Sequence, residues 1–413
     1  MTPARPRGIP PTGAGGPAAA GAPRDAAPAV LWARYRRPLA IALGCTALLR
    51  FMVELVALVS KFGSDFPHVI ARTPGAMSSV LDQWDAGIYV YIAIHGYPPG
   101  RIGPGTQNVI AFPPMLPFLE RVLHVVTGIG YVEAGQAIDL VALVVALVGL
   151  HRLVTLDHPD GAADRTVVLT VAWPAAFFLV AGYPESLALA LLVWAFVTAR
   201  SGRWSVAGLL LAAACMSKYY LILAVLPLAY EWWTARRGAE VDPGTWYARA
   251  AALVGPPVVT FGAWMIFCAV RFGDPLAFAH AEEGWNRSFA WPWHMVARTG
   301  GDLWHLRFLD TSVASTDELV SAVTIVVLVV ATVSAFRHLR RSYAVLLALL
   351  TAVYGCETLL EGTARESLVA FPLFVVMATW CERHPWLERV LFALFLPTAY
   401  YLIERYVDLR FAG

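Results

Sequence analysis

The chain has 413 residues, of which 58% are hydrophobic and 15% charged, against roughly 25% charged residues in a typical soluble domain. So little charge cannot cover a water-soluble fold, and uncharged apolar runs recur along nearly the whole chain. The net charge of +2 gives no basic field of the kind that nucleic-acid binding needs. The five cysteines lie in apolar segments without a CxxC spacing, which supports neither a disulfide framework nor a zinc site. We therefore expect a membrane protein.

The N-terminal segment is rich in Pro, Gly and Ala and cannot bury enough apolar surface to fold. We predict a disordered cytoplasmic tail over residues 1–33 and one transmembrane domain over residues 34–413. The first apolar stretch, residues 38–59, follows three arginines and is too long for a signal-peptide core. It is predicted to remain as an anchor that runs from the cytoplasm to the outside.

Ten further apolar segments can each carry a span, which makes about eleven transmembrane helices in an all-α polytopic membrane protein. They are residues 134–151, 166–182, 184–199, 204–217, 219–233, 250–270, 318–336, 342–360, 367–381 and 386–404. A further stretch, 109–128, contains three prolines. If it crossed, the later arginine clusters would lie outside, which the positive-inside rule disfavours, so we place it at the outer interface. Two long outer loops follow, residues 60–133 and 271–317.

The sequence of the first outer loop predicts one short amphipathic helix over residues 79–98, which lies flat at the outer membrane interface. Ser79 followed by Asp82 resembles a capping box, and Gly96 is a helix stop. Helical spacing then defines two faces, one with Trp84, Ile88, Tyr91 and His95 and the other with Asp82, Asp85 and Tyr89. The helix N-terminus stabilises both aspartates as anions, which suits carboxylates of an active site. The alternative is that they are ordinary N-terminal helix charges on a solvated face.

Few ionisable groups are expected near the outer ends of the spans, where such groups usually line a polar cavity. They are Asp139, Glu185, Lys218, Glu357, Glu361 and Arg365. Lys218 and Arg365 are solitary cations on the side that the arginines avoid, so they are candidates to hold a lipid phosphate. Snorkelling at the interface is the alternative for each. Arg50 and Glu54, four residues apart in the first span, more simply form a structural ion pair.

The second outer loop holds four tryptophans, Trp285, Trp291, Trp293 and Trp304, beside several acids and histidines. An interfacial aromatic belt is the simplest interpretation, and a surface that stacks on a sugar is the alternative. The spacing of the acids and histidines matches no metal motif. We therefore expect no metal and no cofactor.

The first loop carries Trp84-Asp85-Ala86, then Tyr89, Ile92-Ala93 and His95-Gly96-Tyr97. This run closely resembles the WDAxxFxxIAxxGY signature of the PIG-V mannosyltransferases, which add the second mannose to GPI anchors, and of their bacterial relatives. Three later segments resemble further family elements in the same order and extend the likeness over most of residues 80–375. They are Ala111 to Pro117 (FFPxxP), Ala181 to Leu187 (GYxEAL), and Arg365 with Phe371-Pro372-Leu373.

This resemblance implies a GT-C glycosyltransferase fold at the cell membrane, with a polyprenyl-phosphate sugar as the donor and an acidic base at Asp85. Lys218 stands where relatives usually carry an arginine, which keeps the charge and loses the bidentate fork. With Arg365 it is the candidate for the donor phosphate. Residues assigned to the acceptor or to secondary roles are Asp82, Tyr89, His95, Tyr97, Tyr183 and Glu185.

The function predicted from the sequence is inverting transfer of a mannosyl residue to a glycolipid or protein acceptor, with no nucleic acid involved. A lipid or sugar transporter or flippase is the alternative from another class, because many spans with buried charges also suit transport. The chain shows no repeated halves of the kind common in transporters. Protein O-mannosyltransfer and arabinosyl transfer also remain open, as does the acceptor.

Overall fold

The computed structural model describes residues 28–62, 80–100, 107–236, 242–294, 297, 301, 313–358, 360 and 362–408. These residues form α-helices joined by short 3₁₀ helices, and the β-structure among them is a single bridge between Phe289 and Glu357. The predicted all-α class is confirmed. Most of the predicted disordered tail, residues 1–27, lies outside the described residues.

Five helices in this part of the chain are long and apolar enough to cross a membrane. They are α1 (Pro28–Phe62), α6 (Tyr131–Val154), α11 (Pro243–Phe272), α14 (Val313–His338) and α18 (Pro385–Val407). A sixth span results if residues Thr363–Val369 and α17 (Phe371–Arg383), which are bent 86° apart, form one broken crossing. The chain is thus a multi-pass membrane protein, and the count of eleven spans stays a prediction.

The helix α8 (Glu185–Arg200) has 16 residues, the length predicted for this span. Three other expected spans are shorter than predicted: α9 (Trp204–Cys215), α10 (Val225–Ala235) and α15 (Arg341–Gly355). The expected continuous span over 166–182 is wrong, because α7 (Asp160–Ala172) ends before Trp173 and a 3₁₀ helix, η3 (Ala176–Val180), follows. Trp173 precedes Pro174 and takes ψ 139°, since a following proline disfavours the helical conformation. The expected span over 342–360 ends at Gly355 because Cys356 accepts a hydrogen bond from Ala290 of the second loop.

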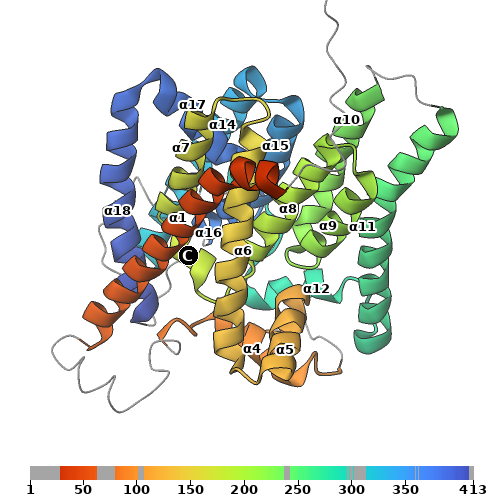
Figure 1. Ribbon diagram of the computed structural model, residues 1–413. Coiled ribbons are helices and arrows are strands. Elements are labelled where there is room, and N and C mark those ends of the chain that lie inside the picture. The colour runs from red at the N-terminus through yellow and green to blue at the C-terminus, as the bar shows by residue number, and fades with distance from the viewer. Residues whose placement is uncertain are drawn as a thin grey trace, which may run out of the picture.

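The helices α6, α8, α9 and α11 pack in succession and form one side of the bundle (Figure 1). At its lower end in this view, α4 (Asp85–His95) and α5 (Met115–Thr127) lie against the start of α6. The 13 residues of α5 are too few for a bilayer crossing, which takes about 20. The catalytic loop predicted from the sequence therefore covers one end of the helix bundle.

Ion pairs of arginine hold the opposite end together, where the sequence predicts the cytoplasmic connections. Arg37 Nη2 lies 2.5 Å from Asp164, Arg340 Nε lies 2.6 Å from Glu231, and Arg165 Nε lies 3.3 Å from Glu388. Arg200 pairs with Asp157. Each pair links different helices or the turns beside them, so these arginines fix how the helices meet at that end.

One close approach between helices can be tested at Gly208 of α9. A Cβ at this position would lie 2.3 Å from the carbonyl oxygen of Ala252 in α11, so Gly208→Ala has to push the two helices apart. We expect a loss of about 1–3 kcal/mol in unfolding free energy, measured by thermal unfolding in detergent. Gly255→Ala in α11 is the matched control, because its Cβ meets nothing within 4 Å. Equal stability of the two variants would contradict the packing.

Candidate active site

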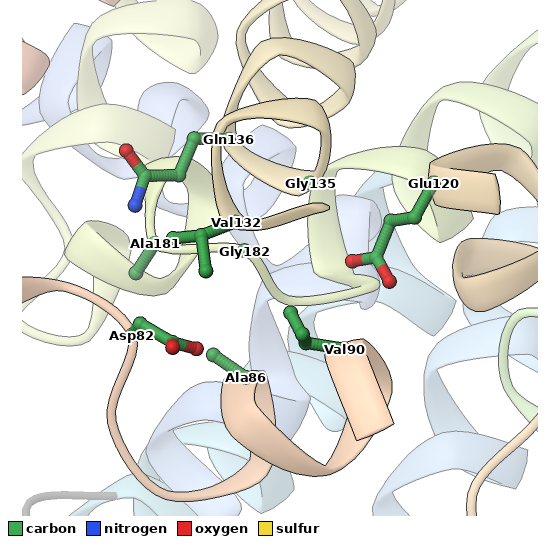
Figure 2. Close-up of a pocket in the computed structure, with 9 residues that line it drawn as sticks. All are labelled: Asp82, Ala86, Val90, Glu120, Val132, Gly135, Gln136, Ala181 and Gly182. Atoms are coloured by element: carbon green, nitrogen blue, oxygen red, sulfur yellow. The ribbon is translucent and has the colours of Figure 1, made fainter. Parts of the chain in front are cut away.

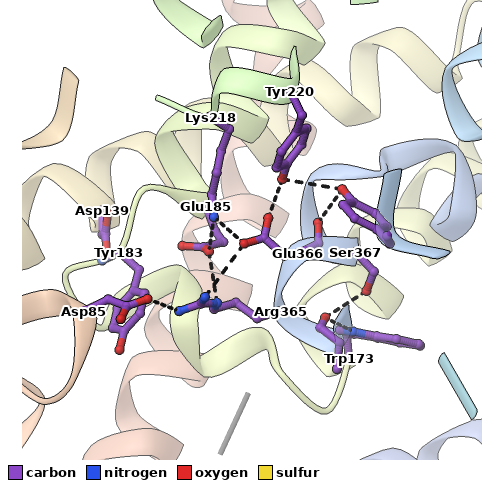
Figure 3. Close-up of polar contacts among 12 residues, drawn as sticks. Asp85, Asp139, Trp173, Tyr183, Glu185, Lys218, Tyr220, Arg365, Glu366 and Ser367 are labelled. Atoms are coloured by element: carbon purple, nitrogen blue, oxygen red, sulfur yellow. Dashed lines mark hydrogen bonds and ion pairs between the residues drawn. The ribbon is translucent and has the colours of Figure 1, made fainter. Parts of the chain in front are cut away.

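The ends of four helical elements converge on one polar cluster inside the bundle (Figure 3). Asp85 is the first residue of α4, and Glu185 is the first residue of α8. Lys218 precedes the 3₁₀ helix η4 (Tyr219–Ala224), and Arg365 lies in the short helix α16 (Thr363–Glu366). A helix N-terminus stabilises a carboxylate as an anion, so both acids sit where the backbone favours their charge.

The contact between Asp85 and Arg365 joins the first outer loop to the late part of the chain. Arg365 Nη1 donates to Asp85 Oδ2 at 2.6 Å, across 280 positions of sequence. The Arg365 side chain is 8% exposed and that of Asp85 is 27% exposed. The guanidinium also lies over the rings of Phe178 and Tyr183, each 5.3 Å from its carbon. The structure thus brings together the predicted base and one of the two predicted phosphate ligands.

Lys218 lies behind Arg365 and is held by two carboxylates. Its Nζ donates to Glu185 Oε1 at 2.9 Å and to Glu366 Oε1 at 2.8 Å. The same Glu185 oxygen lies 3.6 Å from Arg365 Nε, so Glu185 connects the two cations. Three carboxylates, Asp85, Glu185 and Glu366, therefore face the two cations of this cluster.

Sequence reasoning missed Glu366 and the tyrosines that hold it. Tyr220 Oη donates to Glu366 Oε2 at 2.5 Å, and Tyr354 Oη donates to the Glu366 carbonyl at 2.9 Å. An available signal was its place directly after Arg365 and before an apolar run, where an ionisable residue is expensive unless it is paired. Glu361, which the sequence singled out nearby, lies outside the described residues.

Asp139 and Tyr183 shape the turn between η3 and α8. Asp139 Oδ2 accepts hydrogen bonds from the backbone N–H groups of Gly182, at 2.8 Å, and Tyr183, at 2.9 Å. Gly182 has φ 82°, a conformation that side chains beyond glycine rarely adopt. Tyr183 Oη then donates to the carbonyl of Gln83 at 3.0 Å. The turn is thereby tied to the segment that precedes Asp85.

The predicted helix start in this loop is wrong. The helix α4 begins at Asp85 and ends at His95, with Gly96 as its C-cap at φ 71° as expected. Asp82 precedes the helix, and Ser79 lies outside the described residues. Tertiary hydrogen bonds to residues 81–83 replace the predicted capping box, and Asp82 therefore shares no helix face with Asp85.

Asp82 instead lines a narrow pocket beside Ala86 and Val90 of α4, together with Glu120 of α5 (Figure 2). Glu120 is 1% exposed, and its Oε2 and the Oδ1 of Asp82 are buried without a hydrogen-bond partner among the described residues. Burial, and then the charge of Asp82, raise the pKa of Glu120 to about 8. Burial, and then the charge of Glu133, raise the pKa of Asp82.

The other residues assigned to secondary roles divide into two groups. Tyr89 is buried at the edge of the cluster, where burial and then the charges of Glu185 and Asp85 raise its pKa. His95 is exposed, and its ring lies 4.7 Å from that of Tyr91 at an interplanar angle of 43°. Tyr97 Oη donates to the carbonyl of Phe112 at 2.7 Å. The structure does not bring His95 and Tyr97 to the cluster.

The second outer loop lies beside the segment that leads to Arg365. Phe289 bridges to Glu357, and Arg287 Nη1 lies 3.9 Å from the Glu357 carboxylate. Trp291 and Trp293 are exposed and stack on each other at 4.8 Å. Trp304 lies outside the described residues. Among the described residues, no group of three or more His, Cys, Asp or Glu side chains is placed to hold a metal ion.

Comparison with known proteins gives one curated relative. No protein-family model matches the chain. The chain is 25% identical to GPI mannosyltransferase 2 of Yarrowia lipolytica over 166 residues. This alignment covers 38% of this chain and 46% of that protein. The chain thus spans about half the length of this relative.

Two solved structures of the Archaeoglobus fulgidus oligosaccharyltransferase are also similar. The apo form gives a TM-score of 0.47 at 11% identity, over 89% of this chain and 56% of that chain. The complex with zinc and sulfate gives 0.44 at 12% identity, over 88% and 53%.

The buried ammonium of Lys218 is expected to be essential for stability. Lys218→Met removes the closer cation and leaves Glu185 and Glu366 with only the longer contacts to Arg365, at 3.6 Å and 3.8 Å, which should cost about 3–5 kcal/mol of unfolding free energy. Lys218→Arg keeps the charge and should cost less, and Lys218→Met with Glu366→Gln should regain part of the loss. Thermal unfolding in detergent measures all three. A Lys218→Met protein that melts like the wild type would contradict the described pairing.

The raised pKa of Glu120 predicts that the free energy of unfolding falls as the pH rises. Its pKa is about 8 in the folded protein and about 4.3 unfolded, so between these values the unfolded chain ionises while the folded chain stays protonated. Each pKa unit corresponds to about 1.4 kcal/mol, so we expect the free energy of unfolding to fall on the order of 4–5 kcal/mol over this range. Glu120→Gln removes the titration and should unfold at a higher temperature than the wild type at pH 8, with little difference at pH 5. Parallel pH profiles of the two proteins would contradict this prediction.

Proposed function

We propose that this chain is an inverting GT-C glycosyltransferase. It moves a mannosyl residue from a polyprenyl-phosphate donor to a glycolipid or other acceptor at the outer membrane leaflet. The observation that carries the proposal is the contact of Asp85 with Arg365 at the meeting of helix ends, with Lys218 one carboxylate away. The partial identity with a mannosyltransferase supports the choice of sugar.

Asp85 is proposed as the general base of the transfer. Its carboxylate takes the proton of the acceptor hydroxyl while that oxygen attacks the anomeric carbon from the face opposite the phosphate. The bond between the anomeric carbon and the phosphate oxygen breaks, and the phosphate leaves with the electron pair. A single displacement inverts the configuration, as in an inverting hydrolase with the acceptor in place of water.

Arg365 and Lys218 are proposed to neutralise the departing phosphate. In the structure both cations are already paired with carboxylates, so the phosphate has to compete for them. We expect the phosphate to displace Asp85 from Arg365 first, because the Asp85 carboxylate is the most exposed of the three. Its side chain is 27% exposed, against 0% for Glu185 and 9% for Glu366. Donor binding would then free the Asp85 carboxylate for the acceptor hydroxyl.

This competition gives Asp85→Asn an unusual expected phenotype. The neutral amide cannot serve as a base, so turnover should fall by about 10²–10⁴-fold. The amide also competes less for Arg365, so the donor should bind more tightly, by about tenfold for a charge-assisted hydrogen bond no longer displaced. Purified protein in detergent is assayed for transfer of radiolabelled mannose from a short-chain polyprenyl phosphate to a membrane-lipid extract. Donor affinity is measured separately by titration calorimetry.

Asp160→Asn is the matched control, because Asp160 has a 62% exposed side chain at the other end of the bundle, loosely paired to Arg37 at 3.7 Å. This variant should keep normal turnover and normal donor affinity. Near-normal turnover of Asp85→Asn would remove Asp85 from the role of base. Weaker donor binding by Asp85→Asn would show that Arg365 does not exchange the carboxylate for the phosphate.

A further inference from the structure

The backbone just before Asp85 is strained. Trp84 has φ 56° and ψ −124°, and it is one of two residues other than glycine with positive φ in the described part of the chain. These angles are those of the first central residue of a type II′ turn, which glycine dominates. The turn is closed by a hydrogen bond of 3.2 Å from the Ala86 N–H to the Gln83 carbonyl. Asp85, the proposed base, is the next residue of this turn.

Such a conformation persists only where its surroundings enforce it. Two buried tyrosine hydroxyls do so here. Tyr406 of α18 donates to the Leu81 carbonyl at 2.7 Å and accepts from the Gln83 N–H at 3.3 Å. Tyr183 donates to the Gln83 carbonyl at 3.0 Å. The segment that enters the turn is therefore held at the Leu81 carbonyl, the Gln83 N–H and the Gln83 carbonyl.

The two tyrosines are themselves rigidly placed. Each is 1% exposed, and their ring centres lie 6.3 Å apart. The ring of Tyr406 also packs edge-on against Phe177 at 5.3 Å and Phe178 at 5.7 Å. The guanidinium of Arg365 in turn lies over the rings of Phe178 and Tyr183. One aromatic cluster thus supports both partners of the contact between Asp85 and Arg365.

We propose that Tyr406 is a positioning residue for the base, acting through the strained turn at Trp84. Its hydroxyl holds residues 81–83, the turn then places the Asp85 carboxylate, and loss of the hydroxyl lets the turn relax and the carboxylate move. This inference rests on the proposed role of Asp85. It assigns a catalytic effect to α18, more than 300 positions away in sequence.

The first test separates positioning from binding. Tyr406→Phe keeps the ring and its packing and removes the hydroxyl, so kcat should fall on the order of 10- to 100-fold for a misplaced base. The KM for the donor should change by less than about twofold, because Arg365 rests on Phe178 and Tyr183 rather than on Tyr406. Tyr400→Phe, on the same helix and 50% exposed, is the control and should leave both constants unchanged.

The second test uses the strain itself. Trp84→Gly and Trp84→Ala both remove the indole, but only glycine adopts positive φ without cost. In the Tyr406→Phe background the glycine variant should therefore keep the turn and show about tenfold higher kcat than the alanine variant. In the wild-type background the hydroxyl holds the turn in either case, so the two variants should differ by no more than about twofold. Mannosyl transfer to a membrane-lipid extract is the assay, with thermal unfolding of every variant alongside.

An equal ratio of glycine to alanine activity in both backgrounds would overturn the inference. So would an unchanged kcat in Tyr406→Phe. If Tyr406→Phe does not fold, Tyr183→Phe removes the other hydroxyl and receives the same glycine and alanine pair, with the same expected ratio. Failure of the proposed function is distinguishable, because then the wild-type protein itself would not transfer mannose, or Asp85→Asn would still do so.

Discussion

The salt bridge between Asp85 and Arg365 is the interaction on which the rest of the site depends. Ionised groups are costly inside an apolar bundle unless each is paired and hydrogen-bonded, and removing one partner leaves an uncompensated charge. Arg365 is 8% exposed and Glu185 is fully buried, so the cluster is stable only when α4, α8, η4 and α16 deliver their ends to one place. The broken helix at residues 363–369 and the tight turn at Gly182 follow from that requirement.

The same salt bridge couples the two proposed substrates. A base that is paired with a guanidinium is a poor base, and a guanidinium that is paired with a carboxylate is a poor phosphate ligand. A donor phosphate that takes Arg365 changes both conditions at once, so acceptor activation would depend on donor binding. The strained turn at Trp84, held by Tyr406 and Tyr183, fixes where the freed carboxylate stands.

Hydrophobic runs predicted the long helices α1, α6 and α11 well, because a lipid environment leaves a continuous apolar signal. The sorting of charges by side selected Lys218 and Arg365, which the structure places in one cluster with Asp85. The start of α4 was not predictable from local sequence. Tyr183 and Tyr406 form hydrogen bonds with residues 81–83, and these override the local capping pattern of Ser79 and Asp82. Partnerships over 280 positions, such as that of Asp85 with Arg365, leave no local signal at all.

Transfer in reconstituted proteoliposomes distinguishes an inverting glycosyltransferase from a lipid transporter. Polyprenyl phosphate carrying radiolabelled mannose is supplied with a membrane-lipid acceptor, and the anomeric configuration of the product is determined by NMR. For an inverting transferase with Asp85 as its base, the label should move to the acceptor with inverted configuration, and Asp85→Asn should abolish this transfer. Movement of the intact donor between leaflets, with the label still on its phosphate, would contradict this function and identify a lipid transporter.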